Sequence, residues 1–212
     1  MAGGGQLGVL RGVETAAVST GETDRLLVLI GDSIRLGYQA TVRQHLPGTD
    51  IWSPEANGGD SANVLAHLDQ WVGVRSPCVV HLNCGLHDLK KPFDNGRAQV
   101  GLADYGRNLG SIFDQILAMG SRLIWATTTP VDEVLHHRNK GFDRLTADVD
   151  AYNSVALELA AERNIPVDDL HAVIDDAGRT RLLKEDGVHF VDEGSRLLGE
   201  AVAAFVRPFL SG

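Results

Sequence analysis

The sequence LLVLIGDSIRLG, residues 26–37, decides the fold. Its first five residues are apolar, which predicts a strand that is buried on both faces. The apolar run ends at Gly31, and a helical pattern begins just after Ser33. A hydroxyl at the carboxyl end of a buried parallel strand lies where open α/β sheets bind their ligands. The start of the helix leaves backbone N–H groups unpaired, so one turn offers a nucleophile and part of an oxyanion hole.

Composition fits an ordinary globular chain. The 212 residues suit one domain, and a hydrophobic fraction of 43% is enough for a sizeable core. We expect residues 1–24 to be a loosely packed lead-in and residues 25–212 to be a single domain. The formal net charge of −9 argues against a nucleic-acid partner, which requires a basic face, and favours neutral or weakly charged small molecules.

The sequence gives no sign of a membrane or secretory segment. No apolar run approaches the roughly 18–20 residues that cross a bilayer, and the N-terminal residues lack the basic start and apolar block of a secretory signal. If the chain is complete, we expect a cytoplasmic location and no membrane partner.

Strand and helix patterns alternate along the chain. This alternation predicts a three-layer α/β/α sandwich with a doubly wound, five-stranded parallel sheet of the flavodoxin-like type. Residues 131–145 are polar and predict an irregular rim or lid over the edge that carries Ser33. The expected strands are 26–30, 51–52, 78–83, 123–127 and 165–167, and the expected helices are 34–46, 62–72, 105–119, 147–163 and 193–209.

A second candidate cluster lies just before the last helix, where Asp186 and His189 are three residues apart. A histidine that takes a proton from a hydroxyl needs a carboxylate to fix its tautomer and to stabilise the imidazolium. Side chains at this spacing can meet on one turn. Either cluster taken alone has a simpler explanation, because Asp, Ser and His are also common as capping and surface turn residues.

Four short blocks in a fixed order carry more weight than any one of them. They are GDS at 31–33, GDS at 59–61, GLHD at 85–88 and DGVH at 186–189. In this order and on this strand–helix frame, the chain resembles the SGNH (GDSL-type) hydrolase family over roughly residues 25–207.

The resemblance implies a role for each matching residue. Ser33 would be the nucleophile, His189 the general base and then acid, and Asp186 its carboxylate partner. The backbone N–H groups of Ser33 and Gly59 would hold the oxyanion. The family takes a third donor from the Asn of Gly-x-Asn-Asp, and this chain has His87 there. Our hypothesis is that His87 donates in its place, because imidazole carries an N–H; the alternative is a structural histidine.

Other chemistries find little support in the sequence. The adjacent pair His136-His137 lacks the spacing of metal ligands, and we expect neither a metal nor another cofactor. The chain has no Gly-x-Ser-x-Gly elbow, P-loop or dinucleotide fingerprint. Asp32 and Asp88 are expected to stitch turns through hydrogen bonds to backbone N–H groups.

The resemblance therefore implies a carboxylic ester hydrolase that works through an acyl-enzyme on a small-molecule ester. Short-chain or acetyl esters, acetylated carbohydrates among them, are the implied substrates. Two alternatives stay open: a non-catalytic domain that binds a small ligand on the same fold, and an acyltransferase that uses the same three side chains. The oligomeric state is left open as well.

Overall fold

A five-stranded parallel sheet forms the centre of the computed structural model, which describes Met1 and residues 26–210. The strand order is β2-β1-β3-β5-β7. The strands are β1 (Leu26–Ile30), β2 (Asp50–Trp52), β3 (Val79–Leu82), β5 (Arg122–Ala126) and β7 (Val167–Asp168). Two short strands, β4 (Lys91–Pro92) and β6 (Phe142–Asp143), pair antiparallel outside this sheet. The expected lead-in at residues 1–24 lies outside the described residues except for Met1.

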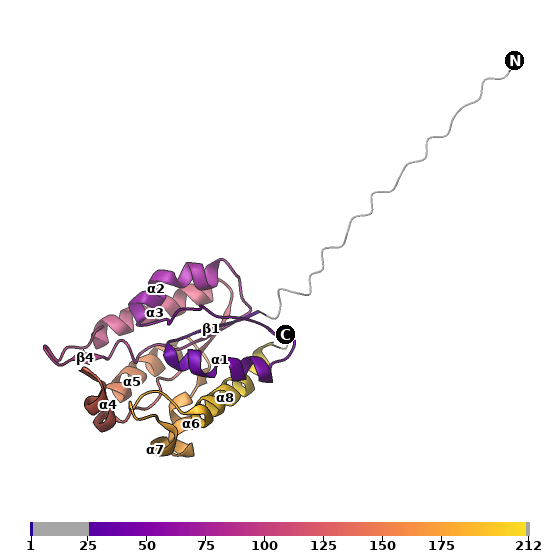
Figure 1. Cartoon of the computed structure of the whole chain (residues 1–212). Coiled ribbons are helices and arrows are strands. Elements are labelled where there is room, and N and C mark those ends of the chain that lie inside the picture. The colour runs from indigo at the N-terminus through magenta and orange to yellow at the C-terminus, as the bar shows by residue number, and fades with distance from the viewer. Residues whose placement is uncertain (2–25, 211–212) are drawn as a thin grey trace.

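Two layers of helices cover the sheet, one on each face (Figure 1). Helices α1, α6 and α8 pack together in one layer, and α2, α3 and α5 pack in the other. The three-layer α/β/α sandwich predicted from the sequence is thus confirmed. The helical elements are α1 (Ser33–His45), α2 (Ser61–Leu68), the π-helical η2 (Asp69–Gly73), α3 (Leu102–Ala118), α4 (Glu133–Asn139), α5 (Thr146–Glu162), α6 (Leu170–Ala177), α7 (Arg179–Leu182) and α8 (Asp192–Leu210).

Strand β1 occupies the position that its apolar sequence predicts. Residues 27–30 are fully buried, and β1 pairs in parallel with β2 on one side and with β3 on the other. The chain leaves β1 toward one side of the sheet order and β3 toward the other, which makes the gap between their carboxyl ends the topological switch point of the fold. Ser33 follows β1 and His87 follows β3, so both flank the place where such folds bind ligands.

The structure corrects the sequence-based expectation for residues 131–145, which contain α4 and β6 instead of an irregular loop. Helix α4 is short and polar, so it lacks the apolar periodicity that reveals a helix in sequence. Asp132 caps it by accepting hydrogen bonds from the backbone N–H groups of Val134 and Leu135. Helices α6 and α7 were not predicted either; Gly178, with a φ of +94°, separates them.

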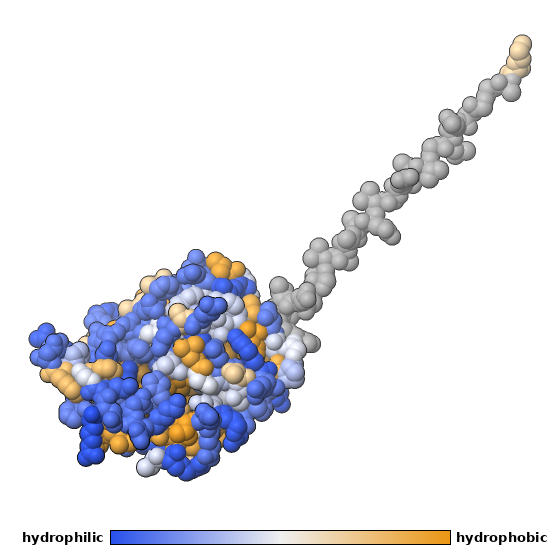
Figure 2. Space-filling model, viewed as in Figure 1, coloured by the Kyte–Doolittle hydropathy of each residue, from blue (hydrophilic) through white to orange (hydrophobic). Residues whose placement is uncertain are grey.

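The surface shown in Figure 2 is mainly hydrophilic, with small hydrophobic areas scattered over it. Within the described part of the chain, no helix is both long and apolar enough to span a membrane.

Candidate active site

Ser33 is the first residue of α1, at the carboxyl end of β1. The preceding Asp32 is buried and caps the helix, because its Oδ1 accepts a hydrogen bond from the N–H of Ile34 at 2.9 Å. The N–H of Ser33 itself has no acceptor within the helix, as at every helix start. The hydroxyl and a backbone donor of the same residue therefore lie together at the switch point.

Asp186 and His189 lie on the turn before α8. Asp186 Oδ1 accepts hydrogen bonds from the backbone N–H groups of Val188 and His189 at 3.1 and 2.9 Å. An isolated bridge between Leu183 and Phe190 closes the base of this turn. The backbone thus fixes one oxygen of the carboxylate and leaves the other directed at the imidazole.

The structure brings Ser33, His189 and Asp186 together in one chain of hydrogen bonds. His189 Nδ1 lies 2.5 Å from Asp186 Oδ2, and His189 Nε2 lies 2.8 Å from Ser33 Oγ. Because a carboxylate only accepts, the ring proton belongs on Nδ1, and Nε2 is left with a lone pair. The neutral imidazole can therefore accept the proton of the Ser33 hydroxyl.

The surroundings of Asp186 keep it ionised. Burial acts to raise the pKa of Asp186, but the hydrogen bonds from His189 and from the N–H of Val188 outweigh it and hold the pKa well below its ordinary value. Lys140 Nζ lies 3.4 Å from Asp186 Oδ2 and adds a positive charge. A permanently charged carboxylate is what stabilises an imidazolium on His189.

The second block, residues 57–61, lies against the end of β1. The N–H of Gly58 donates to Gly31 O at 3.0 Å, and a Cβ at position 58 would lie only 2.7 Å from that oxygen. Gly59 has a φ of +66°, and its N–H donates to Oδ1 of the exposed Asn57 at 2.8 Å. The N–H implied for the oxyanion hole is thus accessible to an oxygen acceptor, and an amide oxygen occupies it here.

His87 lies in the turn after β3, half-buried, and its ring has no hydrogen-bond partner among residues 26–210. Burial lowers the pKa of His87, Asp32 acts in the opposite direction, and the charge of Arg144 lowers it further. A neutral ring carries one N–H donor. His87 is therefore an unpartnered donor near the switch point.

Asp88 and Ser61 join the second and third blocks below the surface. Asp88 is fully buried; its carboxylate accepts two hydrogen bonds from the Ser61 N–H, at 2.9 and 3.1 Å, and one from Ser61 Oγ at 2.5 Å. Burial raises the pKa of Asp88 to about 7, against the opposing effect of these hydrogen bonds. Asp32 and Asp88 thus make the backbone contacts expected from the sequence.

This arrangement predicts a pH-dependent contribution to stability. The carboxyl of Asp88 stays protonated up to about pH 7 in the folded chain but only up to about pH 4 in the unfolded chain. The folded state binds the extra proton in that window, so stability falls as the pH rises. Between pH 5 and pH 8 we expect the wild type to lose about 2–3 kcal/mol more unfolding free energy than Asp88→Asn, as measured by urea denaturation. The exposed Asp176→Asn serves as control, and equal losses in wild type and Asp88→Asn would contradict the prediction.

Helix α4 adds side chains that the sequence analysis did not place at this site. His136 is fully buried, and its Nδ1 lies 2.9 Å from the carbonyl oxygen of Asp186. Asn139 Nδ2 donates to Glu185 O at 2.7 Å, and Lys140 pairs with Asp186. The helix therefore supports the turn that carries His189. The capping aspartate at position 132 was the one sequence signal for it.

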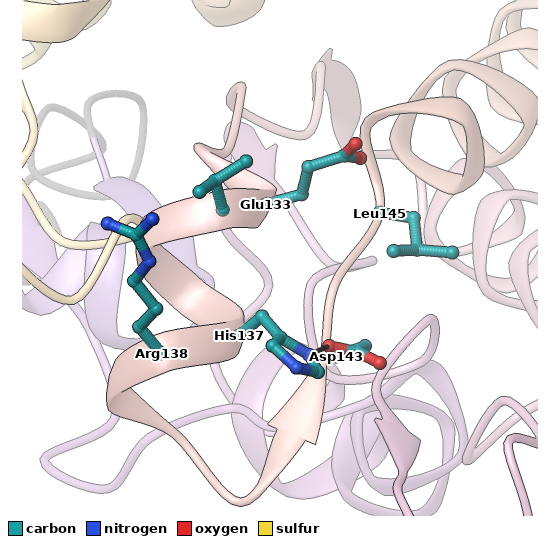
Figure 3. A pocket seen from close by; sticks show the side chains of 6 residues that line it. Glu133, His137, Arg138, Asp143 and Leu145 are labelled. Atoms are coloured by element: carbon teal, nitrogen blue, oxygen red, sulfur yellow. Dashed lines mark hydrogen bonds and ion pairs between the residues drawn. The ribbon is translucent and has the colours of Figure 1, made fainter.

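A hollow of about 280 Å³ lies on a different face of α4. Figure 3 shows Glu133, His137 and Arg138 on the helix, with Asp143 and Leu145 on the segment opposite. None of the residues that line it belongs to the Ser33–His189–Asp186 chain. Across it, His137 Nδ1 lies 2.7 Å from Asp143 Oδ1. No cluster of three or more metal-ligating side chains occurs within residues 26–210.

A serine, a histidine and an aspartate that are hydrogen-bonded in this order, at the carboxyl edge of a parallel α/β sheet, form the arrangement of a serine hydrolase. The chain belongs to the GDSL-like Lipase/Acylhydrolase family, whose sequence model matches residues 29–197. Membership in this family supports ester hydrolysis as the class of activity.

Solved structures share the fold of this chain. A lipase/acylhydrolase from Enterococcus faecalis has a TM-score of 0.71 at 23% identity and covers 87% of this chain and 96% of its own. An acetyl xylan esterase has a TM-score of 0.69 at 18% identity, and the match covers 84% of this chain and 98% of the esterase. A GDSL-like lipase from Bacteroides thetaiotaomicron has a TM-score of 0.70 at 18% identity, and the match covers 92% of this chain and 91% of the lipase. No curated protein matches the chain.

Proposed function

We propose that the protein hydrolyses carboxylic esters through an acyl-enzyme on Ser33. The observation that carries the proposal is the chain of hydrogen bonds from Ser33 Oγ through His189 to Asp186, at 2.8 and 2.5 Å. The geometry is that of a nucleophile, a base and a group that orients the base.

The reaction has two halves. Ser33 Oγ attacks the ester carbonyl carbon while its proton moves to His189 Nε2, and Asp186 stabilises the imidazolium. When the tetrahedral intermediate collapses, the C–O bond to the alcohol breaks and His189 returns the proton to the leaving oxygen. Water then attacks the acyl-enzyme with the same assistance and releases the acid. These steps need only the ester, water and the chain's own side chains.

The oxyanion of each tetrahedral intermediate would lie among three donors. These are the N–H groups of Ser33 and Gly59 and one ring N–H of His87. The Gly59 N–H already holds an amide oxygen in this structure, which an oxyanion would replace. Donors of this kind act most strongly when they are fixed before the reaction begins.

Short-chain or acetyl esters are the proposed substrates, acetylated carbohydrates among them. The fold is shared with an acetyl xylan esterase, which gives this choice its support. Turnover of p-nitrophenyl acetate, p-nitrophenyl decanoate and acetylated xylo-oligosaccharides tests it. We expect the acetyl esters to have the highest kcat/KM, and a preference for the decanoate would overturn the choice of acyl group.

The proposed role of His87 leads to a separate prediction. We expect His87→Ala to lower kcat by about 10²–10³-fold with little change in KM, because the loss of one oxyanion donor acts on the transition state. His87→Asn restores a fixed N–H donor and should recover part of the loss. Steady-state kinetics of the three proteins at neutral pH measures the effect. An unchanged kcat in His87→Ala would remove His87 from the mechanism.

A further inference from the structure

Arg144 is a buried cation at the edge of the candidate active site. Its side chain is only 6% exposed, and its Nε donates to Leu86 O at 2.6 Å. Leu86 directly precedes His87. The charges of Asp32 and Asp186 both act on the pKa of Arg144, which burial lowers. The geometric link to the site is the bond to Leu86, and the residue before Ser33 and the carboxylate that orients His189 both exert an electrostatic effect on the guanidinium.

Among residues 26–210, the terminal nitrogens of Arg144 have no hydrogen-bond acceptor. No carboxylate lies within 4.0 Å of the guanidinium among residues 26–210, and Nε makes its one hydrogen bond. Neither terminal nitrogen is completely enclosed. A buried cation without a counter-ion is costly, so such groups normally have an anion to complete them.

Arg35 is the other buried arginine among residues 26–210, and its hydrogen bonds differ from those of Arg144. Its terminal nitrogens donate to Gln39 Oε1 and to the carbonyl oxygens of Pro54 and Ala56, at 2.8–2.9 Å. These bonds hold the segment after β2 against α1, which is a structural role. Arg144 has no comparable set of acceptors, so its fork of N–H donors is available to a ligand.

The neighbours of Arg144 form a positively charged cluster around Phe142. Lys90 Nζ lies 4.3 Å and Arg144 Cζ 5.0 Å from the centre of the Phe142 ring, which helps to hold both cations in place. Lys140, which pairs with Asp186, precedes Phe142 by two residues. This cluster stands out in a chain whose formal net charge is −9.

The backbone directs Arg144 away from the hollow of Figure 3. Asp143 and Leu145 line that hollow, and adjacent side chains of an extended segment point to opposite sides. Arg144, between them, instead meets Leu86 near the carboxyl end of β3. The cation therefore belongs to the edge of the sheet that carries Ser33 and His189.

We propose that Arg144 binds an anionic group of the substrate, a carboxylate or a phosphate, so that the site selects esters that carry a negative charge near the scissile bond. The inference rests on the proposed ester hydrolysis and adds the substrate class. A guanidinium fork matches the two oxygens of a carboxylate or phosphate. The expectation from net charge alone was a neutral or weakly charged small molecule, and the proposal narrows it to esters with one anionic group.

Matched esters test the proposal directly. One pair, 4-acetoxybenzoate and 4-acetoxybenzamide, differs by a carboxylate in the leaving alcohol, and 4-acetoxyphenyl phosphate supplies a phosphate there. A second pair, mono-4-nitrophenyl adipate and its methyl ester, differs by a carboxylate in the acyl group. We expect at least one of the two carboxylate esters to have a kcat/KM about 10- to 100-fold above that of its neutral partner. The pair that shows this ratio tells whether the bound charge lies in the leaving alcohol or in the acyl group. Comparison of 4-acetoxyphenyl phosphate with 4-acetoxybenzoate tells whether a phosphate or a carboxylate is preferred.

The variant Arg144→Gln should lower this anionic-to-neutral ratio by a similar factor. Arg163→Gln is the matched control, because Arg163 pairs with Asp114 on the outer helices and should keep the wild-type ratio. If Arg144→Gln does not fold, the ratios of the wild type and of Arg144→Lys decide the question. Ratios near one for every pair in the wild type would overturn the proposal.

A binding measurement separates this inference from the proposed activity. Calorimetry of Ser33→Ala with glutarate and with inorganic phosphate should show binding that is lost when Arg144→Gln is added and kept when Arg163→Gln is added. Binding that depends on Arg144, without turnover of any ester, would support the anion site and reject the esterase proposal. Turnover of neutral esters without anion binding would reject the anion site alone.

Discussion

Replacing Ser33 by alanine is expected to lower kcat by about 10⁴–10⁶-fold for every ester that the wild type hydrolyses. In the proposed acyl-enzyme, the acyl group is bonded to Ser33 Oγ, and His189 Nε2 lies 2.8 Å from this oxygen. Without the hydroxyl, the remaining donors can assist only direct attack by water. Steady-state turnover of p-nitrophenyl acetate measures the loss.

A matched control separates this effect from a loss of structure. Ser111 lies on the exposed face of α3, where its hydroxyl donates to Arg107 O, so Ser111→Ala should keep wild-type kcat. Both variants should unfold at urea concentrations near that of the wild type. Retention of more than a tenth of the wild-type kcat by folded Ser33→Ala would show that another group is the nucleophile.

The substitution Asp186→Asn is expected to lower kcat by about 10⁴-fold. Asp186 Oδ1 accepts hydrogen bonds from two backbone N–H groups. The single side-chain oxygen of an asparagine would therefore take the position of Oδ1 and keep these bonds. Its NH₂ group would then face His189 Nδ1 and donate to it. The ring proton would shift to Nε2, and the imidazole could no longer accept the proton of Ser33.

Asp176→Asn is the control for Asp186→Asn, since residue 176 is exposed on α6 and should have no effect on kcat. The wrong tautomer gives a further readout, because NMR of the imidazole nitrogens should place the proton on Nε2 of His189 in Asp186→Asn and on Nδ1 in the wild type. A kcat within tenfold of the wild type would mean that Asp186 does not orient His189.

The sequence predicted the parts of the fold that depend on local pattern. The apolar run at residues 27–30 indicated a strand buried on both faces, and the structure confirms it. The three-residue spacing of Asp186 and His189 indicated that they meet on one turn, which they do. Their approach to Ser33 spans 156 positions and followed from the family resemblance and the expected sheet edge, not from spacing.

Other parts of the site depend on tertiary packing and were missed for that reason. Helix α4 has no apolar stripe; its cap and its contacts with the turn at 185–186 hold it in place. Arg144 gave no signal in the sequence, because its significance comes from the carbonyl of Leu86, 58 positions away.

The most direct test of the central claim is covalent labelling of the folded protein with a serine-directed fluorophosphonate, followed by peptide mass spectrometry. The account predicts one adduct per chain, on Ser33, with labelling slowed by at least about 10³-fold in His189→Ala, because the base that removes the proton is then missing. Folded wild-type protein that takes up no label, or takes it up on another serine, would contradict the claim that Ser33 is an activated nucleophile.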